Sequence, residues 1–272
     1  MTSLSDSHIQ SLHERPRSIQ PHLKAIEDMA KGSDRLFSAH LNYTDAKGNS
    51  HTIPRFLYAG PGDSSNYLRV GIFAGVHGDE VSGVLASLEL IRRITKNPSL
   101  VQGYELFIFP VCNPTGFADG TRHARGGADL NREFWRGSES IEVVLIERQL
   151  LKLRFNGIIA LHTDDTSAGL YGFVKGHQLT RHVLEPALDA ASSLLPRNYD
   201  RSIDNFQANN GIIETGYTGI LSAPPGQTPK PFEIVFETPH HSPLDQQIEA
   251  HIVATLTILD KFRTLISEGQ NI

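Results

Sequence analysis

The sequence has a single cysteine, Cys112, and lacks long apolar runs and blocks of like charge. One thiol cannot form an internal disulfide, which favours a reducing compartment. No apolar run approaches the roughly 18 residues that a membrane-spanning helix needs. The formal net charge is −5, and without charged blocks the sequence has no electrostatic signature for nucleic acid or an anionic membrane.

Three further absences concern the organisation of the chain. Residues 1–18 are polar and lack the apolar core of a signal peptide, so we expect a soluble, cytoplasmic protein. Internal repeats and low-complexity segments are missing, and no composition change marks a domain boundary. A length of 272 residues lies within the range of one α/β domain. We therefore expect a single domain over residues 1–272.

Apolar segments alternate in a way that predicts strands and helices in turn. The predicted strands are Leu36–Tyr43, His51–Tyr58, Leu68–Ala74, Tyr104–Val111, Gly157–Leu161 and Phe232–Phe236. The predicted helices are Pro21–Ala30, a stretch with apolar residues at helical spacing from Val81 to Ile94, Glu139–Arg154, Gln178–Leu195 and a C-terminal helix that starts near Ser242 and Pro243. This alternation predicts an α/β fold with an open mixed, mostly parallel sheet and helices on both faces.

Polar residues follow the predicted strands, at the sheet edge where open α/β sheets bind ligands. The segment GIFAGVHGDE ends in His77 and Glu80, and GIIAL is followed by His162. The strand FEIVF is followed by Glu237. After YELFIFPV come Asn113 and the segment GTRHARGGADLNR, which contains Arg122, Arg125, Asn131 and Arg132. Four strands thus bring a polar or ionisable group to one edge.

Two histidines and a glutamate form a familiar catalytic zinc set that leaves one position open. His77 and Glu80 are three residues apart at a helix start, so both side chains can reach one ion. His162, 82 residues after Glu80, is the best candidate for the third ligand. Any one of the 13 histidines, taken alone, is more simply explained as a hydrogen-bonded structural residue.

The remaining polar groups suggest roles in hydrolysis. Glu237 could take a proton from water and return it to a leaving group, although an edge-strand surface glutamate is the simpler alternative. Asn131 and Arg132 could hold a carboxylate, since a guanidinium matches it bidentately. Another arginine could stabilise an oxyanion. Arg125 is better explained by an ordinary salt bridge in the loop.

Taken together, these motifs resemble the zinc metallocarboxypeptidases of the carboxypeptidase A type and the related succinylglutamate desuccinylase and aspartoacylase group. The matching pieces are HGDE, NPTGF, GTRHARGGADLNR, LHT and FETP, in the family's order over roughly residues 65–240. HxxE alone is a weak signal. Its combination with DLNR, a later LH and a final FE is specific.

The resemblance implies a zinc carboxypeptidase-like fold that binds one zinc ion. It implies His77, Glu80 and His162 as zinc ligands and Glu237 as the general acid/base. Asn131 and Arg132 would hold the substrate carboxylate, and Arg122 would polarise the scissile carbonyl. The mobile tyrosine of the family's carboxypeptidases would be Tyr217, whose surroundings match the family poorly. The expected partner is a peptide or acyl-amino acid with a free carboxylate.

Several features depart from the family pattern. Ala160 stands where an acidic residue often supports the third ligand. Asp164 and Asp165, close to His162, leave a second metal open. The Glu80–His162 spacing is nearer to that of the deacylases, but only 35 residues follow Glu237, too few for the β-rich domain that deacylases append. No prosegment is recognisable in the sequence, so we do not expect a secreted zymogen.

We therefore expect a zinc metallopeptidase that removes a C-terminal residue from peptides. An N-acyl amino acid deacylase is the alternative within enzymes. A non-catalytic protein that binds peptide carboxylates is the second alternative, although a binding protein has no need of all four of His77, Glu80, His162 and Glu237.

Overall fold

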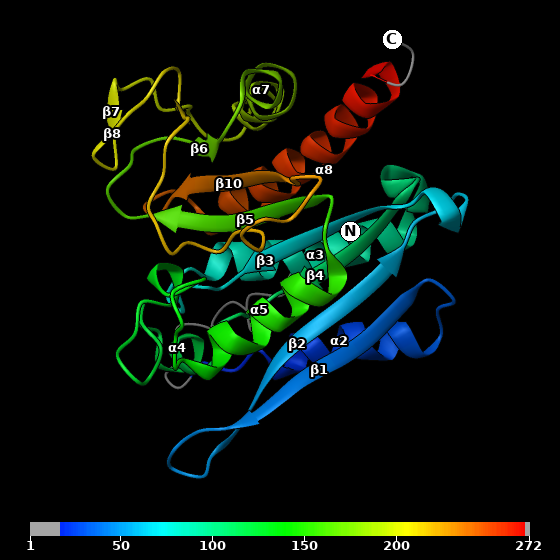
Figure 1. Ribbon diagram of the computed structural model, residues 1–272, viewed down its shortest axis with the longest axis vertical. Coiled ribbons are helices and arrows are strands. Elements are labelled where there is room, and N and C mark those ends of the chain that lie inside the picture. Colours follow the sequence, from blue (N-terminus) through cyan, green and yellow to red (C-terminus); the bar gives the residue numbers. More distant parts are fainter. Residues whose placement is uncertain (1–16, 270–272) are drawn as a thin grey trace.

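The computed structural model describes residues 17–269. Most of the N-terminal segment that lacks a signal-peptide pattern, residues 1–16, lies outside this range. Along the described residues, every helix is too short or too polar to cross a membrane. The described chain forms an eight-stranded sheet with helices on both faces (Figure 1), as the sequence predicted.

Four parallel strands form the centre of the sheet. In spatial order they are β4 (Tyr104–Phe109), β3 (Leu68–Ala74), β5 (Gly157–Asp164) and β10 (Phe232–Pro239). On the β4 side the sheet continues antiparallel through β2 (Ser50–Ala59) and β1 (Leu36–Thr44). On the β10 side it continues through β6 (Tyr171–Val174), antiparallel to β10, and β9 (Ile212–Ile213).

The helices form one layer on each face of the sheet (Figure 1). One face is covered by α2 (Gln20–Lys31), α3 (Val81–Lys96), α7 (Glu185–Ala191) and α8 (Leu244–Gly269). The other is covered by α5 (Ile141–Leu153). Alternating strand residues separate the two cores, because Ile159 packs with the α3 side and Ile158 with the α5 side.

The order in which the chain adds strands to the sheet switches sides at β3. From β3 it moves by way of α3 to β4 on one side, and from β4 by way of α5 to β5 on the other side. Such a switch in strand order leaves a crevice at the carboxyl ends of the two strands beside it, here β3 and β5. His77 and Glu80 follow β3, and His162 lies near the end of β5.

The predicted bounds of two strands and one helix were wrong. His162 and Glu237 were expected just after their strands, but they lie inside β5 and β10, because the parallel ladder pairs them with each other and continues beyond them. The helix predicted over Gln178–Leu195 is divided into α6 (His177–Leu179), the π-helical η4 (Thr180–Leu184) and α7, which ends at Ala191. Pro186, at the start of α7, cannot donate a backbone hydrogen bond, and the preceding turn is wider than an α-helical turn.

Several short elements lie in segments that were not predicted as regular structure. They are α4 (Pro114–Asp119), the 3₁₀ turns η1 (Ser64–Asn66), η2 (Pro98–Val101) and η3 (Leu130–Arg132), and a hairpin of β7 (Ser202–Ile203) and β8 (Phe206–Gln207). The segment from η3 and the β7–β8 hairpin both reach the cavity above the carboxyl ends of β3 and β5.

Candidate metal and catalytic site

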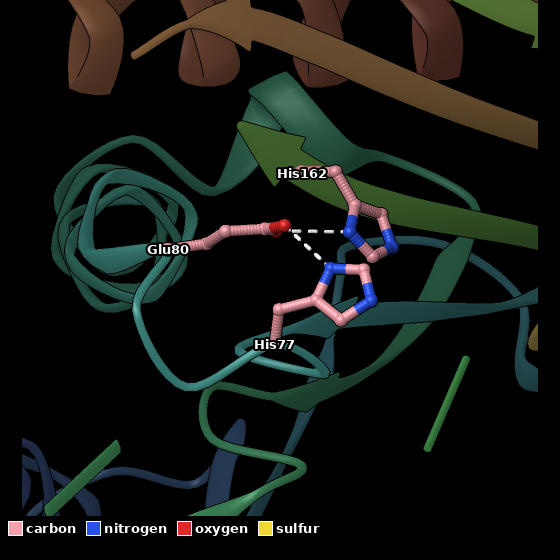
Figure 2. Close-up of side chains that lie close together, drawn as sticks. All are labelled: His77, Glu80 and His162. Atoms are coloured by element: carbon pink, nitrogen blue, oxygen red, sulfur yellow. Dashed lines mark hydrogen bonds and ion pairs between the residues drawn. The ribbon is translucent and has the colours of Figure 1, made fainter. Parts of the chain in front are cut away.

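His77, Glu80 and His162 come together at the switch point of the sheet (Figure 2). His77 and Glu80 lie on the loop between β3 and α3, with Glu80 at the N-cap position of α3, and His162 projects from β5. One ligand atom from each residue lies within 4.8 Å of the others, and the side chains are 3%, 4% and 2% exposed. Three potential ligands this close and this buried form a compact metal-binding set.

Both histidines direct Nδ1 at the Glu80 carboxylate. His77 Nδ1 lies 2.5 Å from Glu80 Oε1, and His162 Nδ1 lies 2.9 Å from Glu80 Oε2. Burial alone would raise the pKa of Glu80, but the two imidazoles outweigh it and lower that pKa. Burial likewise opposes protonation of His77, yet the Glu80 and Asp129 carboxylates raise its pKa to about 9. The cluster therefore attracts positive charge.

The donor set fits a divalent metal ion. Two imidazole nitrogens and a carboxylate oxygen converge on one point, which is the ligand chemistry of catalytic zinc sites. The Nε2 atom of His162 is buried and has no hydrogen-bond partner among residues 17–269. The sequence raised the question of how His162 is oriented with Ala160 two residues before it. Among the described residues, Glu80 contacts Nδ1 of its ring, and the ring lies beside that of His77, with 4.9 Å between the centroids.

Asp129 holds the His77 ring and was not predicted from the sequence. Its Oδ1 atom lies 3.2 Å from His77 Nε2, and its Oδ2 atom accepts a hydrogen bond of 3.2 Å from Arg122 Nε. Asp129 also caps η3 by accepting from the Asn131 amide. A carboxylate behind a metal-binding imidazole fixes its tautomer and orientation. The sequence signal that could have identified Asp129 is the aspartate of DLNR, which stands at the N-cap position of η3.

Glu237 lines the same cavity as this cluster. Successive strand side chains alternate between faces, so Glu237 shares the face of its register partner, His162. Burial raises the pKa of Glu237 well above its usual value, and the carboxylates of Glu80, Asp164 and Asp204 raise it further. A carboxyl group with a raised pKa can exchange a proton near neutral pH.

The residues expected to bind the substrate surround the same cavity, whose volume is about 350 Å³. Arg122 Nη1 lies 3.9 Å from Glu80 Oε1. The Arg132 guanidinium stacks 4.0 Å above the Tyr217 ring. The Oδ1 atom of Asn131 accepts a hydrogen bond from the Leu221 backbone amide. The side-chain nitrogen of Asn131, Nδ2, is left for a ligand. All four residues line the cavity.

Tyr217 and Arg125 were the uncertain residues of the sequence analysis. Tyr217 lines the cavity and donates a hydrogen bond of 2.9 Å to Asp204 Oδ1. Arg125 forms a bidentate pair with Asp119, at 2.6 and 2.8 Å, and is not among the residues that line the cavity. The contacts of Arg125 agree with an ordinary loop salt bridge.

Two further cavity residues had no recognisable sequence signal for the site. Asp204, on the β7–β8 hairpin, and Tyr171, on β6, are brought there by the tertiary fold. Tyr171 donates to Asp164 Oδ2 at 2.8 Å, and Thr166 also donates to this carboxylate. Within the described residues, His77, Glu80 and His162 are the single group with metal-ligand geometry, and Asp164 and Asp165 form no second one.

The sheet, its switch point and the His–Glu–His cluster define an α/β protein of the zinc carboxypeptidase fold class with a candidate metal centre. Residues 66–199 match the family model of the succinylglutamate desuccinylase/aspartoacylase catalytic domain. This match confirms the resemblance that the motifs HGDE, DLNR and LHT indicated, and FETP lies beyond the matched residues. A search of curated proteins found no match.

Solved structures share the fold at low sequence identity. A candidate metallopeptidase from Shewanella amazonensis is 23% identical, with a TM-score of 0.72 over 89% of this chain and 91% of that one. A metallo-carboxypeptidase from Burkholderia cenocepacia is 16% identical, with a TM-score of 0.70 over 91% and 70% of the chains. A metallo-carboxypeptidase from Pseudomonas aeruginosa, in complex with (2-guanidinoethylmercapto)succinic acid, is 17% identical, with a TM-score of 0.66 over 89% and 68%.

Proposed function

We propose that this protein is a zinc-dependent hydrolase that cleaves an amide bond next to a free carboxylate, most simply as a metallocarboxypeptidase. The observation that carries the proposal is the convergence of His77, Glu80 and His162 with Glu237 around one cavity. Two histidines and a carboxylate match the ligand set of catalytic zinc better than that of magnesium or calcium, which prefer oxygen ligands. A binding protein would not need Glu237 beside this set.

Zinc held by these three residues would supply Lewis acidity and make water more acidic. Glu237 then takes a proton from the attacking water and passes it to the leaving amine. Arg122, between Asp129 and Glu80, presents guanidinium N–H groups to the developing oxyanion. Asp129 holds His77 in one orientation throughout.

Arg132 and Asn131 bind the substrate carboxylate in this proposal. Arg132 is oriented by stacking on Tyr217 and by a hydrogen bond to the Asn131 carbonyl, which leaves part of its guanidinium for a ligand. The Pseudomonas aeruginosa carboxypeptidase was solved with a succinic acid derivative, a ligand that carries carboxylates. A ligand of that chemistry agrees with carboxylate recognition in this fold.

Two observations bear on the choice between a peptidase and a deacylase. The family match to desuccinylases and aspartoacylases favours an N-acyl amino acid deacylase as the second candidate. The cavity, however, shares Phe173, Gly216, Tyr217, Ile220 and Val235 with an adjoining groove of about 1070 Å³. Space that continues beyond the site suits an extended substrate better than a small acyl group, so we favour the peptidase.

The test combines metal analysis of the purified protein with a small substrate panel. One zinc per chain and cleavage of a tri- or tetrapeptide are expected. Hydrolysis of acyl-amino acids with no cleavage of peptides would identify a deacylase instead. Absence of bound metal together with absence of hydrolysis would reject both.

The carboxylate requirement is tested with paired free-acid and amidated substrates. Bound substrate would cover the half-buried Arg132 guanidinium. Leaving it unpaired there costs about 2–5 kcal/mol, so amidation should lower kcat/KM by at least about 30-fold. Arg132→Ala should remove that preference. Arg125→Ala is the matched control, because Arg125 lies in the same segment but pairs with Asp119. Equal cleavage of both substrates by the unmodified enzyme would reject the role of Arg132.

A further inference from the structure

A buried polar cluster lies behind the candidate site, on the opposite face of the sheet. It consists of the hydroxyls of Ser82, Thr163 and Thr238 and the imidazole of His251. Ser82 Oγ lies 2.7 Å from Thr163 Oγ1, and Thr163 Oγ1 lies 3.3 Å from Thr238 Oγ1. All four residues are buried, with His251 and Thr238 fully inaccessible.

His251 joins this hydroxyl cluster from helix α8. Its Nε2 atom lies 3.1 Å from Thr238 Oγ1 and 3.3 Å from Ser82 Oγ. Burial is the main cause that lowers the pKa of His251 to about 3, so its ring is neutral at physiological pH. Its Nδ1 atom has no hydrogen-bond partner in the described part of the chain. The hydrogen-bonding contacts of the ring therefore run through Nε2, which faces the hydroxyls, while the ring itself packs edge-to-face with Phe236.

Each hydroxyl belongs to a segment that carries a candidate site residue. Ser82 is two residues after Glu80, Thr163 directly follows His162, and Thr238 directly follows Glu237. Since strand side chains alternate between faces, the side chains of Thr163 and Thr238 lie on the opposite face of β5 and β10 from those of His162 and Glu237. The cluster therefore connects, from behind, the three segments that carry two metal donors and the acid/base.

The start of α3 has little freedom to move independently of β5. A Cβ atom added at Gly83 would lie 3.0 Å from the Leu161 carbonyl oxygen, so the helix backbone packs directly on the strand. The Ser82–Thr163 contact lies beside this close approach. A change in the cluster would therefore move Glu80 relative to His162.

Stability alone is a weak reason for this cluster. Replacing buried polar partners with apolar groups of the same shape is often neutral or stabilising. Thr255 shows the simpler arrangement one turn further along α8, where its hydroxyl donates to the His251 carbonyl of its own helix. The cluster around His251 instead crosses between α3, β5, β10 and α8.

We propose that His251 and the three hydroxyls are positioning residues that set the distances between Glu80, His162 and Glu237. The inference rests on the proposed function, because it assigns the cluster to a metal-dependent hydrolytic site. Ser82, Thr238 and His251 do not line the cavity, and Thr163 borders it. They act through the segments that they connect.

The test is a cobalt titration of the full chain that records the Kd and the visible absorption spectrum. Thr238→Val and His251→Leu should weaken cobalt binding by about 10- to 100-fold, the usual effect of disturbing groups behind metal ligands, and should change the spectrum. His251→Gln, which can still present a polar atom to the hydroxyls, should restore both. Thr255→Val is the matched control and should bind cobalt as the unmodified chain does.

Each outcome decides a different point. Folded Thr238→Val and His251→Leu variants with unchanged Kd and spectrum would overturn the inference and leave the proposed function intact. The same loss of binding in Thr255→Val would also overturn it, by showing a nonspecific effect. If His251→Leu fails to fold, Thr238→Val and Ser82→Ala decide alone. An unmodified chain that binds no cobalt would overturn the proposed function and this inference together.

Discussion

Two carboxylates of one cavity, Glu80 and Glu237, have pKa values shifted in opposite directions. Glu80 is buried between two imidazoles, which lower its pKa despite burial. Burial raises the pKa of Glu237, and neighbouring carboxylates add to the increase. Environments that separate the pKa values of two acids also separate their roles, one as a ligand and one as a proton carrier.

Replacing Glu237 with glutamine should therefore preserve metal binding and remove most of the turnover. Glutamine cannot accept the proton from water, and general acid/base catalysis contributes roughly 10²–10⁴-fold to kcat. Metal content and kcat are measured on the same preparation. Glu233→Gln is the control, because Glu233 lies on the same face of β10 and accepts from the Ala223 amide. A decrease in kcat of less than about tenfold would exclude Glu237 as the base.

His77 makes metal affinity depend on pH. Burial opposes its protonation, but Glu80 and Asp129 raise its pKa to about 9 in the metal-free protein. A metal ligand must be the neutral imidazole, so binding below pH 9 displaces a proton. We expect the logarithm of the metal association constant to rise by about one for each pH unit between pH 7 and 9. A pH-independent Kd over this interval would contradict the prediction.

The raised pKa of His77 also determines how the stability of the metal-free chain changes with pH. The folded-state pKa of His77 is above its ordinary value of 6.5. Its contribution to the free energy of unfolding is therefore fully present below pH 6.5 and is lost as the pH rises towards 9. Asp129→Asn should reduce this dependence, which urea titrations at several pH values would measure.

Helices and strands with a clear hydrophobic periodicity could be predicted from the sequence, and short elements could not. Strand β3 was predicted with its observed bounds, and α3 and α5 within a few residues. The short strands β6 to β9 contain too few residues for a recognisable alternation. His77, Glu80, His162 and Glu237 could be found because each follows or ends an apolar strand. Asp204 could not, since tertiary packing alone brings its hairpin to the cavity.

The loop between β3 and α3 depends on one glycine for its close approach to α4. A Cβ atom at Gly78 would lie 2.0 Å from the Gly116 carbonyl carbon and 2.2 Å from the Phe117 nitrogen. Both are backbone atoms, so the loop carrying His77 and Glu80 would have to move. We expect Gly78→Ala to lower the free energy of unfolding by about 1–3 kcal/mol, the range of overpacking costs, and to weaken metal binding.

Chemical denaturation and metal titration of Gly78→Ala would measure both effects. Gly126→Ala is the matched control, because a Cβ atom there would have no heavy atom within 4 Å among the described residues. Gly126 also lies in a loop near the site and should tolerate the change. Wild-type metal affinity in Gly78→Ala would show that the loop adapts without moving its donors.

At the scale of the whole molecule, the metal set joins parts of the chain that lie on both sides of the switch point. His77 and Glu80 follow β3, while His162 comes from β5, after the chain has passed through β4 and α5. An ion that binds the three residues together can bind only the folded chain, because the unfolded chain separates Glu80 and His162 by 82 residues. Ligands that bind only the folded state stabilise it by mass action.

Zinc should therefore raise the thermal unfolding temperature of the metal-free protein, and a chelator should reverse the change. At a free zinc concentration of about 100 times Kd, the expected stabilisation is about 2.7 kcal/mol. His77→Ala and His162→Ala should each remove the increase, whereas His123→Ala, a change in an exposed histidine of the arginine-rich loop, should preserve it. Calorimetric scans with and without zinc give the measurement. An equal increase in His77→Ala would mean that zinc stabilises the protein from another site.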